Sequence, residues 1–318
     1  MAVTRSNLLT DAMARQKYAR GVNLLKAEFT GPKTTDLGIP GPMQPVSTYE
    51  LFIVWHHTAM STMTPPTQGD RNAAHRGPVF CPWHRFMLRQ FELNLQRVLG
   101  DANFGLPYWD WAADGQKTAA QQKKSKVWAK DAMGGSGSPV TTGPFKFSAS
   151  SASAFRVRIE ANVNGQLVQT SHGLRRSLGS QIAKLPNRAD ATGAVAMTPY
   201  DDAPWDTSSG GFRNRAEGWA PPAAPALHNR VHVWVGGHML PSSSPNDPVF
   251  YMNHCNIDRL WEAWLSQHGR TYVPAQSAPS SLKGHRINDL MSSLISAPIK
   301  PADVLDMSSS YAYDSLVM

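Results

Sequence analysis

Apolar residues recur at helical spacing in the first third of the chain. The pattern over residues 7–30 predicts an amphipathic helix, which ends before a proline-rich segment at 32–45. A second helix is predicted to begin near Ser47, because Ser47 or Thr48 can cap its first turn and Glu50 follows directly. A third, long helix is predicted from about residue 82 to residue 99.

Regular patterns are sparser after residue 100. Residues 133–154 are small, polar and turn-prone, which predicts an irregular surface segment. The apolar pieces 155–159 and 167–170 predict strands of a small sheet. Helical spacing returns at 228–236 and again at 247–267.

Length and composition fit one globular domain spanning residues 1–318. Hydrophobic residues make up 41% of the chain and charged residues 17%, which is ordinary for a protein with a packed core. No stretch approaches the ~20 apolar residues that cross a bilayer, so no membrane partner is expected. The first residues lack the apolar centre and cleavage site of an export signal. We therefore expect a cytoplasmic protein, with export on a partner's signal left open.

The chain is basic, with a formal charge of +8 and a pI of about 9.6. Nucleic-acid binding requires clustered basic residues with interleaved aromatics. The local cluster, 117–130, has no aromatic residue among Lys123, Lys124 and Lys126. A solvated surface is the better interpretation, and no nucleic-acid partner is expected.

Two cysteines, Cys81 and Cys255, lie far apart in the sequence. Two cysteines in a chain of this length do not make a disulfide framework. Each lies close to a histidine of the groups described next, so we expect both to be buried thiols that pack near those histidines.

Six of the eleven histidines are placed as metal ligands would be. His228 and His232 are four residues apart, so on a helix both imidazoles lie on one face and can share one ion. His254 follows 22 residues after His232, at the start of another apolar helix. A second group occupies the first half of the chain. It consists of His56, His75 and His84.

The residues alone leave the metal open. A histidine pair four residues apart occurs by chance, and a lone helical histidine is usually a surface or core residue. The zinc-protease motif requires glutamate where Asn229 stands. Imidazole also suits zinc, iron and nickel. A dinuclear hydrolase is disfavoured, because such sites use carboxylate ligands and this set is all histidine.

Six longer segments resemble the bacterial tyrosinases, a family of type 3 dinuclear copper oxidases, in order, spacing and flanking residues. The segments are WHHTAM, DRNAAHRGPVFCPWHRFMLRQFE, LPYWDW, FRNRAEGW, LHNRVHVWVGG and NDPVFYMNHCNIDRLW. The resemblance extends from about Tyr49 to the pair Tyr311 and Tyr313, most of the chain. It implies a mainly α fold in which a central four-helix bundle holds a dinuclear copper site, with small peripheral strands and long loops.

The resemblance also implies roles for individual residues. The first copper would be bound by His56, His75 and His84, and the second by His228, His232 and His254. His56, rather than its neighbour His57, aligns with the family's ligand. Glu217 matches the acidic residue above the site, and Asn229 matches a polar residue that orders a water with that acid. In the family proposal, this water helps to deprotonate an incoming phenol.

The chain departs from the family pattern at three places. The histidine that usually precedes the last ligand is Asn253, and an amide is no base near neutral pH. Ala73 stands where eukaryotic relatives often carry a crosslinked cysteine, so no thioether is expected. No further domain follows Tyr313. This leaves an open site or a small separate partner that resembles the copper-delivering caddie proteins.

Aromatic and polar residues are expected around the substrate. They are His57, Asn253, Trp219, Phe80 and Phe250. For His57, a position behind a metal-binding histidine, in contact with it rather than with the substrate, is the alternative. The aromatic side chains fit core packing equally well. Asp247 and Asp258 are candidates for supporting the second copper site, or for capping helices and forming salt bridges, and both alternatives stay open.

Neutral imidazole stabilises both Cu(I) and Cu(II), so two copper ions held close can give dioxygen two electrons together. WHHTAM, the loop GGHMLPSSSPNDP and Asn253 resemble the actinobacterial o-aminophenol oxidases. The expected function is oxidation of o-aminophenols and o-diphenols to quinone imines and quinones, in secondary metabolism. A tyrosinase that hydroxylates monophenols, a C-nitroso-forming oxygenase and a haemocyanin-like oxygen carrier are the alternatives. Carriers usually need large assemblies and a shielding domain, which disfavours the last.

Overall fold

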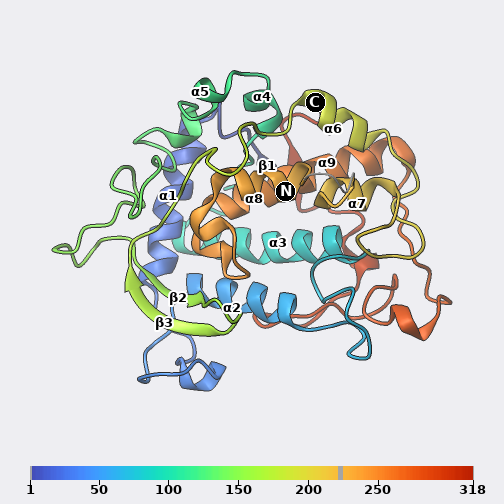
Figure 1. Cartoon of the computed structure of the whole chain (residues 1–318), viewed down its shortest axis with the longest axis horizontal. Coiled ribbons are helices and arrows are strands. Elements are labelled where there is room, and N and C mark those ends of the chain that lie inside the picture. Colours follow the sequence, from blue (N-terminus) through green and yellow to red (C-terminus); the bar gives the residue numbers. More distant parts are fainter. Residues whose placement is uncertain (1, 221–224, 318) are drawn as a thin grey trace.

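Four helices form the centre of the molecule. They are α2 (Thr48–Ser61), α3 (Phe80–Leu99), α8 (Leu227–Val235) and α9 (Val249–His268). The computed structural model describes residues 2–220 and 225–317. In Figure 1, α3 runs across the middle, with α2 below it and α8 and α9 above. The helix α1 (Ala12–Ala27) packs against α2 and α3 at one end. The prediction of a mainly α fold around four helices is confirmed.

Shorter elements surround this centre. The short helices are α4 (Trp111–Gly115), α5 (Ala119–Gln122), α6 (Arg188–Val195) and α7 (Gly211–Glu217). The 3-10 turns are η1 (Thr35–Leu37), η2 (Lys126–Trp128), η3 (Gly237–Met239), η4 (Ser244–Asn246), η5 (Ser280–Leu282) and η6 (Pro301–Val304). Across residues 2–220 and 225–317, no helix is both long and apolar enough to cross a membrane.

Local capping explains where the first two helices begin. The hydroxyl of Ser47 accepts the N–H of Glu50, and the Glu50 carboxylate accepts the N–H of Ser47, so the predicted capping box opens α2. The prediction of a helix over 7–30 was wrong at both ends. Asp11 caps α1 by accepting the N–H of Ala14, which places Leu8 in a buried turn before the helix.

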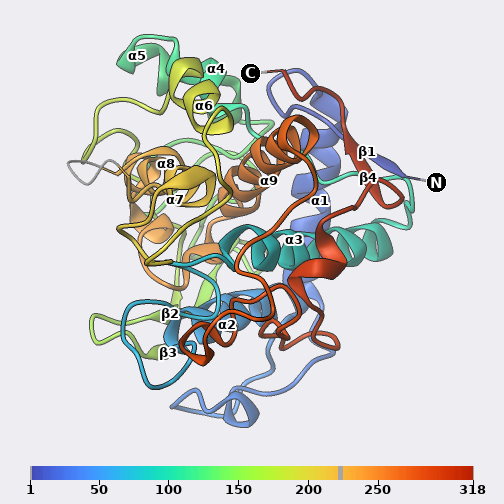
Figure 2. The same ribbon diagram turned by 90° about the vertical axis from the view of Figure 1, so that its right-hand side faces the viewer.

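Two small sheets lie at the periphery. The strands β2 (Val157–Ala161) and β3 (Leu167–His172) pair antiparallel, close to the two strand pieces that the sequence predicts. The strands β1 (Val3–Arg5) and β4 (Tyr311–Tyr313) pair in parallel, and Figure 2 shows them side by side near the N-terminus. This second sheet was not predicted, because three-residue strands have no readable period.

Two tryptophans next to the histidine positions fix α2 against α3. Trp55 and Trp83 are buried with their rings 5.4 Å apart in a T-shaped arrangement. Both indole N–H groups donate to the backbone oxygen of Ser292, over 3.1 and 2.9 Å. The C-terminal segment therefore ties the two helices together beside His56 and His84.

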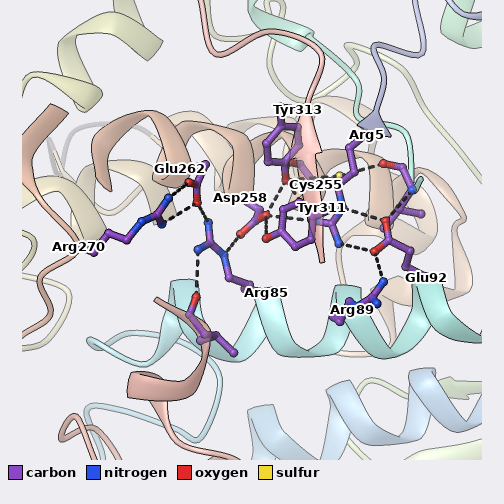
Figure 3. Close-up of polar contacts among 12 residues, drawn as sticks. Arg5, Arg85, Arg89, Glu92, Cys255, Asp258, Glu262, Arg270, Tyr311 and Tyr313 are labelled. Atoms are coloured by element: carbon purple, nitrogen blue, oxygen red, sulfur yellow. Dashed lines mark hydrogen bonds and ion pairs between the residues drawn. The ribbon is translucent and has the colours of Figure 1, made fainter. Parts of the chain in front are cut away.

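A buried ion-pair network joins both ends of the chain to α3 and α9 (Figure 3). Asp258 accepts hydrogen bonds from Arg5, Arg85, Tyr311 and Tyr313 over 2.5–3.0 Å. Burial alone would raise the pKa of Asp258, but Arg85 and Arg5 hold it below its usual range. Of the alternatives for Asp258, the structure therefore shows the salt bridge.

The network predicts a large effect for Asp258→Asn. The amide keeps the shape but removes one of the two carboxylates that each buried guanidinium contacts, since Arg5 keeps Glu92 and Arg85 keeps Glu262. The free energy of unfolding should therefore fall by about 3 kcal/mol. Urea denaturation at pH 7 measures this. The matched control is Asp306→Asn, since that carboxylate is exposed and lies 3.9 Å from Arg270, and it should leave the unfolding midpoint unchanged. A loss below 1 kcal/mol in Asp258→Asn would contradict the prediction.

Candidate metal centre and substrate cavity

The first group of histidines meets between α2 and α3. His56 comes from α2, His84 from the first turns of α3, and His75 from the loop between them. One ring nitrogen from each residue lies within 4.8 Å of the other two, and all three side chains are buried. The helices and their loop therefore bring together three residues that are spread over nearly thirty positions of the sequence.

The second group lies on α8 and α9. His228 and His232 are one turn apart on α8, with ring centroids separated by 4.4 Å. His254 projects from α9, and its Nε2 lies 3.0 Å from Nε2 of His228. The ring nitrogens of this group also lie within 4.8 Å of one another.

The two groups face each other. The rings of His84 and His254 stack with centroids 4.1 Å apart, and those of His75 and His228 are 6.0 Å apart. The structure thus brings together all six histidines singled out in the sequence, as two adjacent triads.

Backbone oxygens determine which ring nitrogen faces the centre. Nδ1 of His56 lies 2.7 Å from the Ser242 oxygen, and Nδ1 of His84 lies 2.8 Å from the Phe80 oxygen. Nδ1 of His232 lies 2.5 Å from the oxygen of Met239. A carbonyl oxygen only accepts, so each Nδ1 donates and each Nε2 keeps its lone pair. Within residues 2–220 and 225–317, these three Nε2 atoms are buried without a hydrogen-bond partner, which fits a cation.

Burial also keeps the histidines neutral. Desolvation lowers the pKa of His56 to about 3 and that of His232 to about 4, even though a backbone oxygen stabilises each protonated ring. The pKa values of His75, His84, His228 and His254 are lowered well below the usual range for the same reason. Neutral imidazole is the form that binds a metal.

One loop, residues 236–247, orients a histidine of each triad, through the backbone oxygens of Met239 and Ser242. The loop is anchored at its end by a buried two-bond ion pair between Asp247 and Arg176, with both contacts at 2.7 Å. The other Asp247 contact is the N–H of Val249, at the start of α9. Asp247 therefore forms a salt bridge and also accepts from the first residue of α9, which follows the N-cap Pro248. Strand β2 supports the loop as well, since the side-chain amide of Asn246 donates to the backbone oxygen of Ile159.

A third group, Glu160, His172 and His238, also has ring and carboxylate atoms within 4.8 Å of one another. Its hydrogen bonding differs from that of the triads. Nδ1 of His238 accepts the N–H of Arg175 at 2.8 Å, so the hydrogen of the neutral ring is on Nε2 and points to Glu160 at 3.2 Å. A nitrogen that carries hydrogen has no lone pair for a metal. We interpret this group as an anchor between β2, β3 and η3.

A cavity of about 310 Å³ opens onto both triads. Its described lining residues are His56, Met60, His75, Arg76, Trp219, Pro225, His228, Asn229, His232, Val233, Leu240, Pro241 and Ser244. Trp219 and Asn229, both singled out in the sequence, are therefore at this cavity. Phe80 and Phe250 instead pack against the histidine rings. The ring centroids of Phe250 and His254 are 4.1 Å apart, and those of Phe80 and His84 are 4.9 Å apart.

Two expected pocket residues do not line this cavity. His57 lines a separate surface cleft with Ile39 and Val54, because adjacent residues of α2 point to different sides. Its Nδ1 lies 2.8 Å from the hydroxyl of Ser242. Asn253 is fully buried in α9 and does not line the cavity.

Glu217 is buried behind the cavity wall at the end of α7. Its Oε1 accepts the backbone N–H of Arg76 at 2.7 Å, and its Oε2 accepts from the Arg213 guanidinium at 3.1 Å. Burial raises the pKa of Glu217, and Arg213 only partly opposes this. Asn229 accepts from Nδ1 of His228 at 2.9 Å and so helps to orient that ring. The sequence reasoning missed Arg76 and Arg213, although Arg76 directly follows a ligand position.

Residues 46–267 match the family model described as the common central domain of tyrosinase. The chain belongs to the tyrosinase family. It is 40% identical over 272 residues to a tyrosinase of Streptomyces glaucescens, covering 84% of this chain and 89% of that one. It is 34% identical to the grixazone synthase of Streptomyces griseus subsp. griseus, with 84% and 90% covered.

Solved structures share the fold. A polyphenol oxidase from Thermothelomyces thermophila is 19% identical with a TM-score of 0.68, covering 98% of this chain and 88% of that chain. A functional unit of octopus hemocyanin is 19% identical with a TM-score of 0.55, covering 99% and 69%. Family membership makes the protein a copper-dependent phenol oxidase with two copper ions as its cofactor.

The two cysteines are free and buried, as expected. Burial raises the pKa of Cys255 to about 12, and the thiol lies 3.4 Å from the backbone oxygen of Leu106. Burial likewise raises the pKa of Cys81. Neither thiol is a nucleophile near neutral pH.

His285 supports the loop that carries His75. It is fully buried, its Nε2 lies 2.8 Å from the hydroxyl of Thr64, and a side chain at Gly77 would meet its ring at 2.9 Å. Burial lowers the pKa of His285 to about 3. The folded protein therefore binds fewer protons here than the unfolded chain once the pH falls below about 6.5.

Stability should consequently fall on acidification, and His285→Gln should reduce the slope. Each such histidine contributes up to about 1.4 kcal/mol per pH unit between the unfolded and folded pKa values. The free energy of unfolding is measured by urea denaturation of copper-free protein from pH 6.5 to pH 4. The contribution of neutral His285 to stability is fully present above the unfolded pKa and is lost as the pH falls toward the folded pKa. Equal slopes in the parent and in His285→Gln would contradict the prediction.

His232→Ala should bind one copper fewer per chain while the fold is retained. The substitution removes one Nε2 from the α8–α9 triad and leaves the other triad complete. The copper-to-protein ratio after dialysis measures it, with circular dichroism as the check on folding. The matched control is His172→Ala, which removes a partly exposed histidine from the third group and should keep two copper ions. Full occupancy in His232→Ala would contradict the ligand assignment.

Proposed function

We propose that the protein oxidises o-aminophenols and o-diphenols with dioxygen at a copper pair held by the two triads. One copper is assigned to His56, His75 and His84, and the other to His228, His232 and His254. The observation that supports this most directly is the pair of facing triads beside one cavity, in which the buried Nε2 atoms of His56, His84 and His232 have no hydrogen-bond partner among the described residues. A copper pair there supplies two-electron redox chemistry with dioxygen.

The cavity suits one flat aromatic ring. Its apolar wall includes Trp219, Val233 and Leu240, which can contact the ring faces, and its floor is formed by the ligand histidines. A substrate with adjacent hydroxyl or amino groups places that edge toward the triads and leaves the opposite edge at the mouth. The apolar residues of the cavity therefore act mainly by orienting the two oxidisable groups of the substrate toward the triads.

We propose that Asn229 and Glu217 act together on the proton of the substrate hydroxyl. Asn229 is at the cavity wall, where its amide can hold a water molecule. Burial raises the pKa of Glu217, which makes its carboxylate a stronger base than usual. Each carboxylate oxygen uses one lone pair for Arg76 or Arg213 and keeps another for a water.

The preference for o-aminophenols is supported by the 34% identity to grixazone synthase. The burial of Asn253 removes one argument for that preference, because this amide does not touch the cavity. The second candidate is a tyrosinase that also hydroxylates monophenols. It is favoured by the 40% identity to the Streptomyces glaucescens enzyme and by the presence of both Glu217 and Asn229.

Oxygen uptake with a panel of substrates tests the proposal. With copper-loaded protein, 2-aminophenol should give a kcat/KM at least about tenfold above that of tyrosine. The reason is that 2-aminophenol already carries two adjacent oxidisable groups, whereas tyrosine must first be hydroxylated on its ring. Copper-free protein is the control and should consume no oxygen. Faster turnover of tyrosine than of any o-aminophenol would establish the second candidate instead.

A further inference from the structure

Among the described residues that line the cavity, Arg76 is the one arginine or lysine. Arg76 directly follows the ligand His75, lines the cavity, and is exposed. Its guanidinium lies over the ring of Trp219, 5.6 Å from the ring centroid. The aromatic face holds the cation beside the substrate space without neutralising it.

The backbone of Arg76 is held in an unusual conformation that places the side chain there. Its φ is +63°, in the left-handed region that residues other than glycine and asparagine seldom adopt. The N–H of Arg76 donates to the buried carboxylate of Glu217 over 2.7 Å. The buried contact stabilises the turn, which directs the side chain toward Trp219 and away from the protein interior.

The charge of Arg76 has no partner in the part of the chain that the structure covers. The guanidinium forms no ion pair or hydrogen bond with residues 2–220 or 225–317. The Glu217 carboxylate contacts the backbone N–H of Arg76 and the guanidinium of Arg213 instead. No aspartate or glutamate is among the described residues that line the cavity.

We propose that Arg76 is a specificity-determining residue that selects aromatic substrates carrying a carboxylate on the ring edge opposite the reacting groups. The proposal rests on the function proposed above, because it uses the same cavity and the same orientation of the ring. With the adjacent oxidisable groups at the triads, a carboxylate on the far edge faces the mouth and the guanidinium. Guanidinium binds carboxylate through two parallel hydrogen bonds, which fixes the ring's rotation as well as its position.

The test compares two catechols that differ in charge, 3,4-dihydroxybenzoate and 3,4-dihydroxybenzamide. Both candidate functions oxidise catechols, so the test does not depend on the choice between them. The quantity measured is the ratio of kcat/KM for the acid to kcat/KM for the amide within each protein. Taking the ratio cancels changes in copper content and in overall activity.

In Arg76→Gln this ratio should fall about tenfold, mainly through a higher KM for the acid, because a charge-assisted hydrogen-bond pair is lost. Arg76→Lys keeps the charge and should retain most of the ratio. Arg20→Gln is the charge-matched control, since Arg20 is exposed on α1 and does not line the cavity. The ratio in the parent should also decrease at high salt.

An unchanged ratio in Arg76→Gln would overturn the inference, and so would an equal fall in Arg20→Gln, which would indicate a general charge effect. If the parent oxidises neither catechol, the proposed function fails and the anion site is tested without turnover. Calorimetric binding of 4-hydroxybenzoate and 4-hydroxybenzamide then decides it. Tighter binding of the acid that disappears in Arg76→Gln supports the site, and equal binding refutes it.

Discussion

The hydrogen bonds from Nδ1 of the histidines to backbone oxygens are the constraint on which the site depends. An imidazole ring has two nitrogens, and only the one without hydrogen can bind a metal. At His56, His84 and His232 the backbone takes the Nδ1 hydrogen, so the Nε2 lone pair of each of these three rings points to the centre. Burial then keeps the rings neutral, which is the form in which imidazole can bind a metal.

Such hydrogen bonds are useful only if the carbonyl groups stay in place, and most of the remaining structure fixes them. The loop 236–247 supplies the carbonyls for one ligand of each triad, and the Asp247–Arg176 pair anchors that loop in the interior. On the opposite side, Trp55 and Trp83 share the oxygen of Ser292 and hold α2 against α3. These contacts therefore help to hold the orientation of the triad rings, although none of them is made by a triad residue.

The sequence predicted the central helices because their signals are local. Ser47 and Glu50 form a capping box three residues apart, and His228 and His232 share a face through helical spacing. The pairing of β1 with β4 joins residues about 300 positions apart, and nothing within three residues of either strand encodes it. The sequence left the side on which His57 lies open for a related reason. The motif shows that two adjacent residues lie on a helix, but the packing of that helix decides which of them faces the cavity.

The third histidine group shows why composition alone does not define a metal site. Glu160, His172 and His238 are as close together as either triad, yet His238 accepts a backbone hydrogen bond where the triad residues donate one. The difference reverses which nitrogen carries the hydrogen, and so turns a possible ligand into a structural contact. Arg175 adds a positive charge 3.0 Å from the same carboxylate, which further disfavours a bound cation. Because the hydrogen-bonding direction depends on the fold, the same three residue types can serve either purpose, and only the surrounding backbone distinguishes them.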